Sequence, residues 1–208
     1  MEEMLELAGQ GAKVMQTRAV EFANKFNIPV RVLSSFNDGN GTLISLEDNS
    51  MENALVSGIA FQKDQVKFTL HGVGDTPGTA FKILGPISDA DVEVDVIVQN
   101  VSIDGKTDFT FTVSTDDQET VENTIESIKE EVNFRELIID SNIAKVSIVG
   151  AGMRSQTGVA STAFKALSDN DVNIQIICTS EIKITMVIDK SLVDKAVNIL
   201  HDAFELDK

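Results

Sequence analysis

Hydrophobic and polar positions follow one order twice in the C-terminal three-quarters of the chain. In each copy, a strand-like alternation leads through a glycine-containing loop into apolar positions with helical spacing, and a second alternating stretch follows. The copies occupy residues 67–102 and 145–181. Their spacing of about eighty residues is too long for a solenoid repeat. The pattern therefore predicts two copies of one small domain.

The first copy continues into a complete set of elements. Asp104-Gly105 is a strong hairpin signal between two alternating stretches, and further apolar positions with helical spacing follow. Asp75 or Thr76 is expected to cap the first helix ahead of the early Pro77. The predicted order is strand, helix, strand, strand, helix, strand, which is the ferredoxin-like arrangement. These elements are expected at 66–73, 77–87, 92–100, 107–113, 119–128 and 134–139.

The second copy lacks one strand of this set. Its elements are expected at 145–149, 159–168, 172–179, 183–188 and 192–204, after which too little chain remains for a fourth strand. A strand-like stretch at 54–61, separated from the next strand by a turn near Lys63-Asp64, has no partner. A bare sheet edge would invite uncontrolled pairing. We therefore expect a first domain at 64–141, inserted into a second domain made of 53–62 and 143–208.

The N-terminal segment differs from both copies. Apolar residues at 4–15 and 19–26 have helical spacing, and Pro29 would end that helix because proline disfavours a helical predecessor. Short strands are expected at 30–33 and 42–44, around a turn-rich loop. This segment is too short to bury a core of its own. Residues 1–50 are therefore interpreted as the tail of a larger domain and a linker.

The composition indicates which kinds of molecule the protein can bind. The 208 residues include 33 acidic and 17 basic side chains, which give a formal net charge of −16. Such a surface repels nucleic acids and anionic membranes, so neither is an expected partner, and a small polar or cationic ligand is favoured. No signal peptide or membrane-spanning stretch is recognisable, so a cytoplasmic location is expected. The single cysteine, Cys178, allows no internal disulfide and is interpreted as a small buried hydrophobe.

The glycine loops resemble dinucleotide-binding loops only superficially. Each glycine pair, Gly72/Gly74 and Gly150/Gly152, lies between a predicted strand and a predicted helix. The third glycine comes too late for G-x-G-x-x-G, and hairpins replace the parallel crossovers of a nucleotide-binding fold. A different use fits better, because glycines let the backbone approach a ligand and the amides at a helix N-terminus bind a carboxylate.

No catalytic constellation is recognisable. His71 and His201 suggest no partnership, the aspartates between helix and strand suit caps and turns, and no nucleophile has a base in a known pattern. We therefore predict no catalytic residue and no metal ligand. The informative polar residues differ between equivalent places in the copies: Asp95, Gln99 and Asn100 against Gln175, Thr179 and Ser180. This difference predicts two unlike pockets; the alternative is that both modules serve only as a dimerisation surface.

Several motifs in the right order resemble the tandem ACT regulatory domains of aspartate kinase. They are GVGDTPG at 72–78, VQNVS at 98–102, VGAGM at 149–153 and TSE at 179–181. Residues 4–46 are similar to the last part of that enzyme's amino-acid kinase domain, so the resemblance covers nearly the whole chain. The family's nested arrangement of ACT domains is also what the missing strand predicts.

The resemblance implies feedback control of the first step from aspartate to lysine, threonine and methionine. The enzyme of this family phosphorylates the aspartate side-chain carboxylate with ATP. This chain lacks the nucleotide loop and the aspartate-binding residues of the kinase, so it is expected to be inactive alone. No cofactor is expected in it, and ATP and magnesium would belong to the missing kinase domain. It resembles a separate small (beta) subunit or a cut regulatory half.

By position, the resemblance implies an effector site in each copy. Amides at the helix start would hold the effector carboxylate, strand carbonyls its amino group, and Asp95 or Gln99 a hydroxyl or ammonium. The first set is Asp75, Gly78, Val94, Asp95, Gln99 and Asn100. The second set is Gly158, Val159, Ala160, Asn173, Ile174, Thr179, Ser180 and Glu181. Asp-Thr-Pro-Gly becomes Ser-Gln-Thr-Gly at 155–158, so the second pocket is expected to be weaker or to serve mainly in pairing.

The mechanism implied is a two-state one. Lysine, threonine or both would bind across an interface between ACT modules of two chains in a homodimer and thereby stabilise the inactive state of a kinase catalytic subunit or domain. The alternative is a free-standing amino-acid sensor or dimerising module without a kinase partner. The kinase-like segment at 1–46 favours the first, because a self-contained sensor needs no kinase tail.

Overall fold

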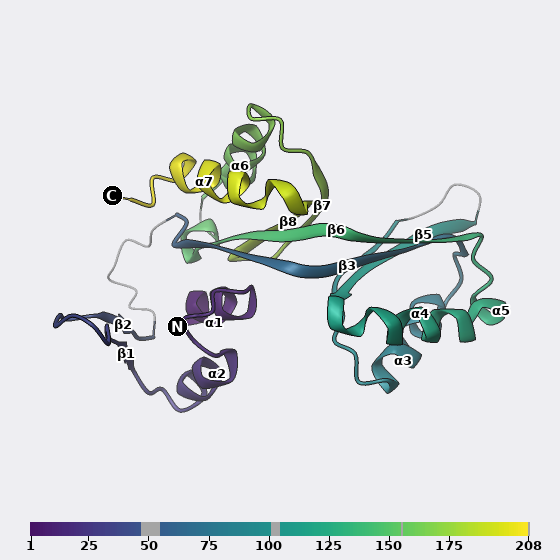
Figure 1. The fold of residues 1–208 in the computed structure, drawn as a ribbon, viewed down its shortest axis with the longest axis horizontal. Helices are drawn as coiled ribbons and strands as arrows, with labels where there is room; N and C mark the ends of the chain where they lie inside the picture. Colours follow the sequence, from purple (N-terminus) through teal and green to yellow (C-terminus); the bar gives the residue numbers. More distant parts are fainter. Residues whose placement is uncertain (47–54, 101–104, 155, 208) are drawn as a thin grey trace. The chain divides into compact units, whose positions relative to one another are not determined.

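The computed structural model describes residues 1–46, 55–100, 105–154 and 156–207 (Figure 1). The chain divides into a central unit, Lys63–Ala144, and a terminal unit, which comprises Met1–Gln62 and Lys145–Lys208. Two long strands, β3 (Gly58–Gly74) and β6 (Glu136–Val149), contribute residues to both units. The end of the predicted tail and linker at 1–50, together with Asp104 and Ser155, lies outside the described residues.

The central unit has the ferredoxin-like order of elements. Its sheet has the strand order β4-β5-β3-β6, and both β3 and β4 pair antiparallel with β5. The elements between β3 and β6 are α3 (Thr79–Asp89), β4 (Asp95–Gln99), β5 (Lys106–Ser114), α4 (Gln118–Ser127) and α5 (Lys129–Val132). This βαββαβ unit confirms the predicted α+β fold class.

The helices of the central unit cover one face of its sheet (Figure 1). Ile83 and Ile87 lie one turn apart on α3, and both are fully buried in the core cluster. Residues four apart share a helix face, so this spacing turns one side of the helix inward. Phe68 and Phe111, from neighbouring strands, stack beneath the helices with ring centroids 5.5 Å apart. The apolar pattern of the sequence therefore places the core of this unit between helices and sheet.

The terminal unit has both faces of its sheet covered. Its strand order is β3-β6-β8-β7, with β7 at Ile174–Thr179 and β8 at Lys183–Asp189. Figure 1 shows α6 (Val159–Ser168) and α7 (Val193–Ala203) on one face and α1 (Glu2–Gly9) on the other. In β6, the consecutive residues Val146, Ser147 and Ile148 are all buried. Because neighbouring strand residues point to opposite faces, this continuous burial requires cover on both.

The N-terminal segment forms two helices and a small hairpin. The structure has α1 and α2 (Thr17–Lys25) within the two stretches of helical spacing, but α1 ends at Gly9, so the helix expected through residue 15 was wrong. Gly11 has φ +99°, a left-handed conformation that ends helical geometry. The strands β1 (Val30–Val32) and β2 (Thr42–Ile44) pair antiparallel. The predicted short strands are confirmed.

Two predicted strand boundaries were wrong. The turn expected near Lys63-Asp64 does not form, because β3 runs unbroken from 58 to 74. Likewise, the separate strands expected at 134–139 and 145–149 are parts of the single strand β6. Asp64 is exposed within β3, and a strand with one face open to solvent accommodates a charged residue without a turn.

Cys178 is half-buried, not buried as the sequence interpretation expected. It lies on β7, which is the end strand of its sheet, and burial alternates along that strand. An edge strand has a neighbour on one side only, so its inward side chains stay partly open to solvent. No helix among the described residues is both long and apolar enough to cross a membrane.

Candidate functional site

The first candidate site begins where β3 leads into α3. Gly78 is the N-cap residue of α3, with φ +95° and no side-chain cap, so the expected cap from Asp75 or Thr76 was wrong. A Cβ at Gly78 would meet nothing within 4 Å. Glycine is therefore required here by the left-handed backbone, which L side chains rarely adopt, and not by lack of space.

Hydrogen bonds fix the shape of this loop. The Thr79 hydroxyl donates to the Gly74 carbonyl oxygen at 2.8 Å and lies 3.2 Å from the Thr76 hydroxyl. The Asp75 amide donates to the carbonyl oxygen of Gly105 at 3.0 Å. The start of an α-helix presents amides without intrahelical partners, and these attract anions. An ordered loop of this kind can present such amides to a carboxylate.

The strand β4 carries a bulge at the candidate residue Asp95. Asp95 pairs with Thr112 and Val98 with Thr110, so β4 holds one more residue than β5 over this stretch. Val96 has φ +36°, a strained value for a β-branched residue. Its amide donates to the Asp95 carboxylate at 2.9 Å. Asp95 therefore stabilises the bulge through its own side chain, a role that the sequence analysis missed.

The second copy also has a glycine N-cap and a bulge in the following strand. Gly158 is the N-cap of α6 with φ +96°, and a Cβ there would also meet nothing within 4 Å. The register of β7 on β8 shifts between Ile174 and Ile176, so Gln175, which matches Asp95 in the repeat, is the additional residue at a bulge near the start of this strand. Bulges next to functional sites commonly redirect a side chain. The repeat therefore preserves the backbone of the helix start, whereas the bulge lies at a different position in each copy.

The structure divides the first set of candidate residues between two ends of β4. Gly74 pairs with Lys106 on one side of β5, and Gln99 pairs with Phe109 on its other side. The Thr107 hydroxyl donates to the Asn100 carbonyl oxygen. Gln99 and Asn100 therefore lie at the sheet end where Asp75 and Gly78 lie, and all four are exposed.

Val94 and Asp95 lie at the opposite end of β4 and are half-buried. At about 3.3 Å per strand residue, Asp95 and Gln99 are roughly 13 Å apart. One module alone thus does not gather the whole first set around a ligand of amino-acid size.

The second set is divided in the same way. Asn173 and Ile174 are at the start of β7, whereas Thr179, Ser180 and Glu181 are at its end. The Gly150 amide donates to the Ile182 carbonyl oxygen at 2.9 Å, which places the loop after β6 beside Glu181. Val159 is buried, while Ala160 is half-buried on the first turn of α6. The roles of all fourteen candidate residues stay predictions.

A polar cluster that the sequence analysis missed lies on the open face of the central sheet. The Asp108 carboxylate accepts from the Gly72 amide at 2.9 Å and lies 2.9 Å from His71 Nδ1. The Gly72 amide, His71 and the nearby Arg135 hold the pKa of Asp108 below its usual value, against the effect of partial burial. Gly72 has φ +70° at a shift in register between β3 and β5. The aspartate therefore stabilises a second bulge.

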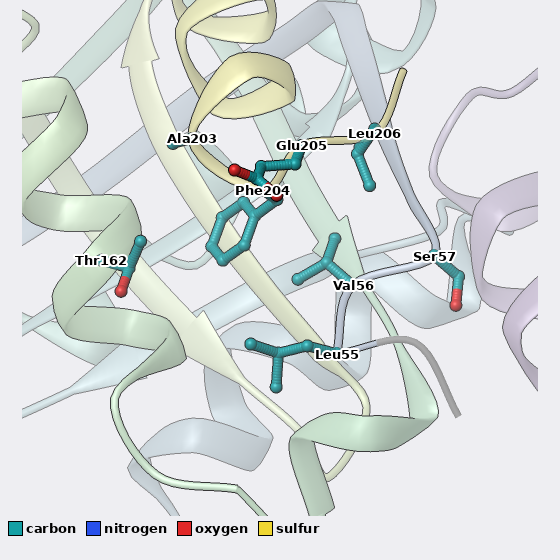
Figure 2. A pocket seen from close by; sticks show the side chains of 8 residues that line it. All are labelled: Leu55, Val56, Ser57, Thr162, Ala203, Phe204, Glu205 and Leu206. Atoms are coloured by element: carbon teal, nitrogen blue, oxygen red, sulfur yellow. The ribbon is translucent and has the colours of Figure 1, made fainter. Parts of the chain in front are cut away.

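Apart from these sites, the terminal unit contains a hollow of about 660 Å³ (Figure 2). Figure 2 shows the Phe204 ring and the side chains of Leu55 and Val56 converging on it. Its lining residues are Leu55, Val56, Ser57, Thr162, Ala203, Phe204, Glu205 and Leu206. None of them is a candidate residue from the sequence, so we assign no ligand to this hollow.

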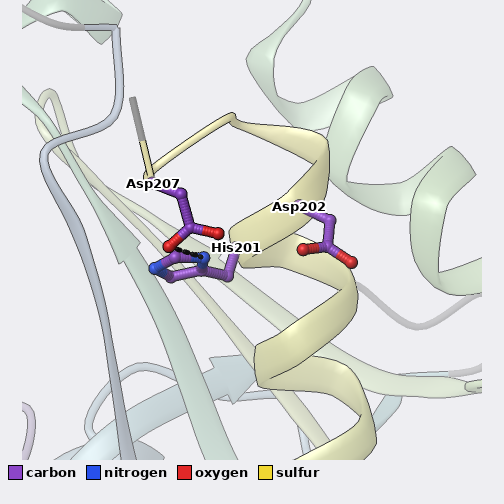
Figure 3. Close-up of side chains that lie close together, drawn as sticks. All are labelled: His201, Asp202 and Asp207. Atoms are coloured by element: carbon purple, nitrogen blue, oxygen red, sulfur yellow. Dashed lines mark ion pairs between the residues drawn. The ribbon is translucent and has the colours of Figure 1, made fainter.

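One group of metal-ligating side chains occurs among the described residues, at the end of α7. The group comprises His201, Asp202 and Asp207. Figure 3 shows the Asp207 carboxylate facing the His201 ring, and His201 Nδ1 lies 3.8 Å from Asp207 Oδ1. Both carboxylates are exposed. Such surface groups gain little from pairing and stay hydrated, so we assign no metal-binding role.

Comparisons with known proteins agree with one another. ACT-domain models match residues 70–133 and 146–204. An aspartate kinase of Pseudomonas fluorescens (strain SBW25) is 57% identical over 207 residues, which make up 99% of this chain and 50% of that protein. The chain therefore spans about half the length of this curated relative.

Two solved structures match the chain over nearly their whole length. The crystal structure of aspartokinase alpha and beta subunits contains a chain that is 42% identical with a TM-score of 0.69, and the match covers 73% of this chain and 99% of that one. The ligand-free regulatory subunit of aspartate kinase from Thermus thermophilus is 33% identical with a TM-score of 0.69, over 72% of this chain and 99% of that subunit.

Proposed function

The chain belongs to the aspartate kinase family and contains two ACT domains of the regulatory region. On this basis we propose that it binds end-product amino acids and thereby mediates feedback inhibition of the kinase. Lysine, threonine or both are the proposed effectors of aspartate phosphorylation by a kinase domain or subunit. The observation that carries the proposal is the repeated helix start, with a left-handed glycine N-cap in both domains. An amino acid offers the carboxylate that such a helix start attracts.

Pairing of two chains would complete each site. The strands β4 and β7 are the end strands in the sheet order, and each carries an exposed isoleucine, Ile97 at 51% and Ile177 at 46%. Apolar edge strands of this kind favour pairing with another strand. An antiparallel pairing of β4 with its copy would bring Val94 and Asp95 of one chain to the Asp75–Gly78 end of the other. The divided arrangement of the candidate residues thus supports binding across a homodimer interface.

The charge of the site suits a cationic effector. Asp75 and Asp95 belong to the first set and Glu181 to the second, in a chain of net charge −16. A carboxylate recognises the α-ammonium group of any amino acid and the side-chain ammonium of lysine in addition. Gln99 and Thr179 offer hydrogen bonds that suit a hydroxyl such as that of threonine. Each acid would act at an interface, where a second chain lowers its exposure to water.

A kinase partner is supported by the apolar surface of the N-terminal segment. The exposed large hydrophobic side chains there include Val14, Phe22, Phe26, Ile28, Leu33, Phe36, Leu43 and Leu46, and Phe36 is 94% exposed. Clusters of exposed apolar residues mark surfaces that another protein part covers. We propose that the rest of an amino-acid kinase domain covers this surface and supplies the ATP, magnesium and aspartate sites.

Calorimetric titration of the full chain with L-lysine and L-threonine, separately and combined, tests the effector proposal. A ligand that binds only the folded chain increases the unfolding free energy, by about 2.7 kcal/mol at one hundred times its Kd. The unfolding temperature therefore rises. Because the chain contains neither Trp nor Tyr, unfolding is best followed by circular dichroism. If neither amino acid releases heat or shifts the unfolding temperature, the effector proposal is rejected.

The variant Asp95→Asn isolates the charge of the first site. Asparagine keeps an oxygen that can accept from the Val96 amide, so the bulge is preserved, whereas Asp95→Ala removes that support. We expect Asp95→Asn to weaken lysine binding about tenfold without lowering the unfolding temperature, because an ion pair to the ligand is lost. Unchanged calorimetric affinity in Asp95→Asn would remove Asp95 from the site.

The competing function is a stand-alone amino-acid sensor or dimerising module. It predicts that the chain stays soluble and dimeric alone and gains nothing from a kinase half. Co-expression with the N-terminal half of the Pseudomonas fluorescens relative distinguishes the two. Co-purification and lysine-sensitive phosphorylation of aspartate support the regulatory function, whereas separate elution of the two parts supports the sensor.

A further inference from the structure

The loop that leads into the helix is longer in the second ACT domain. Residues 75–77 separate Gly74 from Gly78, whereas residues 153–157 separate Gly152 from Gly158. The additional length includes Arg154 at the end of the 3-10 turn η2 (Ala151–Arg154). The shorter loop, Asp-Thr-Pro, carries no basic residue. Arg154 is therefore a feature of the second domain alone.

Arg154 contacts two carboxylates that belong to different parts of the terminal unit. Its Nη2 is 2.7 Å from Glu2 Oε2 in α1, and its Nε is 3.3 Å from Glu181 Oε2 after β7. Glu181 is a residue of the second candidate effector site, and Glu2 opens the helix that covers the other sheet face. One guanidinium thus joins the candidate site to α1.

The helix α1 is held to the second ACT domain through polar groups at its N-terminal end. The Glu3 carboxylate accepts from the Ala151 amide at 2.7 Å and from the Ser57 hydroxyl at 2.6 Å. Ala151 and Arg154 belong to the same 3-10 turn, so this turn contacts the helix at both Glu2 and Glu3.

Further polar residues in and just after α1 also contact the second ACT domain. Glu6 Oε2 lies 2.9 Å from Lys183 Nζ, and the Gln10 side-chain oxygen accepts from the buried Ser147 hydroxyl at 3.0 Å. Residues at positions 3, 6 and 10 share one helix face. Polar contacts of this kind have a small net free energy because water replaces them on release. The helix α1 is therefore held to the sheet by polar contacts at Glu3, Glu6 and Gln10.

We propose that Arg154 couples an amino acid at the second effector site to the docking of α1, a step that rests on the proposed function. The ammonium group of the ligand pairs with Glu181 and displaces the Arg154 Nε from that carboxylate. Arg154 keeps its contact with Glu2 without competition from Glu181, so ligand binding strengthens the docking of α1. By linkage, a docked α1 raises the affinity of the ligand by the same factor. Arg154 is a positioning residue that transmits the occupancy of the site to the kinase-like segment.

Hydrogen exchange of the α1 amides in the ligand-free chain tests the contact. We expect Arg154→Gln to speed exchange at residues 5–10 by about threefold, as for loss of a partly exposed ion pair. Glu181→Gln should slow the same exchange, because it frees Arg154 for Glu2 as the ligand would. The control Lys165→Gln breaks an ion pair with Asp169 on α6 and should change nothing in α1. Unchanged α1 exchange in both Arg154→Gln and Glu181→Gln overturns the proposal.

Saturation with L-lysine, and in parallel with L-threonine, tests the coupling itself. In the wild-type chain, the bound ligand should slow α1 exchange by about threefold, and this slowing should vanish in Arg154→Gln. Arg154→Lys, which keeps the charge, should restore part of it. Slowing that is equal in wild type and Arg154→Gln overturns the coupling alone. If neither the wild-type chain nor any variant releases heat on titration, the effector proposal is overturned as well. Hydrogen exchange of the ligand-free chain then still decides whether Arg154 holds α1.

Discussion

The two ACT domains share a backbone pattern but differ in what their glycine loops contact. In the central unit, the loop after β3 is short and exposed from Asp75 to Gly78. In the terminal unit, the loop after β6 holds α1 through Ala151 and Arg154. The same helix start can therefore serve an open ligand site in one domain and a site joined to a neighbouring helix in the other. The difference arises from the helix α1 in the terminal unit and from the longer loop that carries Arg154.

The sheets differ correspondingly. The central sheet is covered by helices on one face and carries polar cross-strand pairs on the other, such as Lys67 with Asp140 at 3.2 Å. The terminal sheet is covered on both faces, and its polar residues Ser147 and Thr185 are buried with their hydroxyls 2.8 Å apart. Buried hydroxyls require partners, and Gln10 of the N-terminal segment supplies one. The second domain is thus built to hold that segment.

The largest expected difference in stability is between alanine variants of two glycines, Gly150 and Gly74, one from each glycine loop. A Cβ on Gly150 would lie 2.3 Å from the Leu55 carbonyl oxygen and 2.7 Å from Val56 Cα, whereas one on Gly74 would meet nothing within 4 Å. We expect Gly150→Ala to cost about 3 kcal/mol of unfolding free energy, because backbone atoms must move apart. Gly74→Ala should cost less than about 0.5 kcal/mol. Urea unfolding followed by circular dichroism measures both, and equal costs would contradict the close approach.

An intermediate effect is expected to be equal in the two domains. Gly78 and Gly158 have nearly the same left-handed φ and open space around the missing side chain. Alanine at either position should cost about 1 kcal/mol through backbone strain alone. Thermal unfolding of the two variants compares them directly. A cost several times larger at one glycine would show that the two helix starts are not equivalent.

The smallest expected effect concerns a polar cluster that only the central unit has, since Val149 stands where His71 stands in the first copy. The folded-state pKa of Asp108 is lowered, so its contribution to stability is present above the unfolded pKa and is lost as pH falls through the folded pKa. We expect Asp108→Asn to lower the unfolding temperature slightly at pH 7, with a difference from wild type that disappears in acid.

The control for this variant is Asp64→Asn, which removes an exposed carboxylate on the same strand. The unfolding temperature of Asp64→Asn should equal that of the wild-type chain both at neutral pH and in acid. A difference between Asp108→Asn and wild type that persists below the folded pKa would show that the charge of Asp108 does not stabilise the bulge at Gly72.

Local patterns predicted most of the fold. The spacing of Ile83 and Ile87, or of Val121 and Ile125, marks helices that bury one side, and the matching glycines revealed the repeat. The errors occurred where long-range contacts decide. Nothing local indicates that the chain stays extended through Lys63, because that depends on strands far away in sequence. The candidate residues were readable as a set, but their division between two ends of β4 follows from strand pairing alone.

Periodicity and repetition are properties of the sequence, since they depend on residues within one or two turns of each other. They determined the two ACT domains and most of their elements, whereas the glycine N-caps were found only in the structure. Only the tertiary structure decided that Asp95 supports a bulge, that Asp108 contacts Gly72, and that Arg154 lies between Glu2 and Glu181. These contacts join residues whose separation in the chain bears no relation to their distance in space, and packing of the whole unit brings them together.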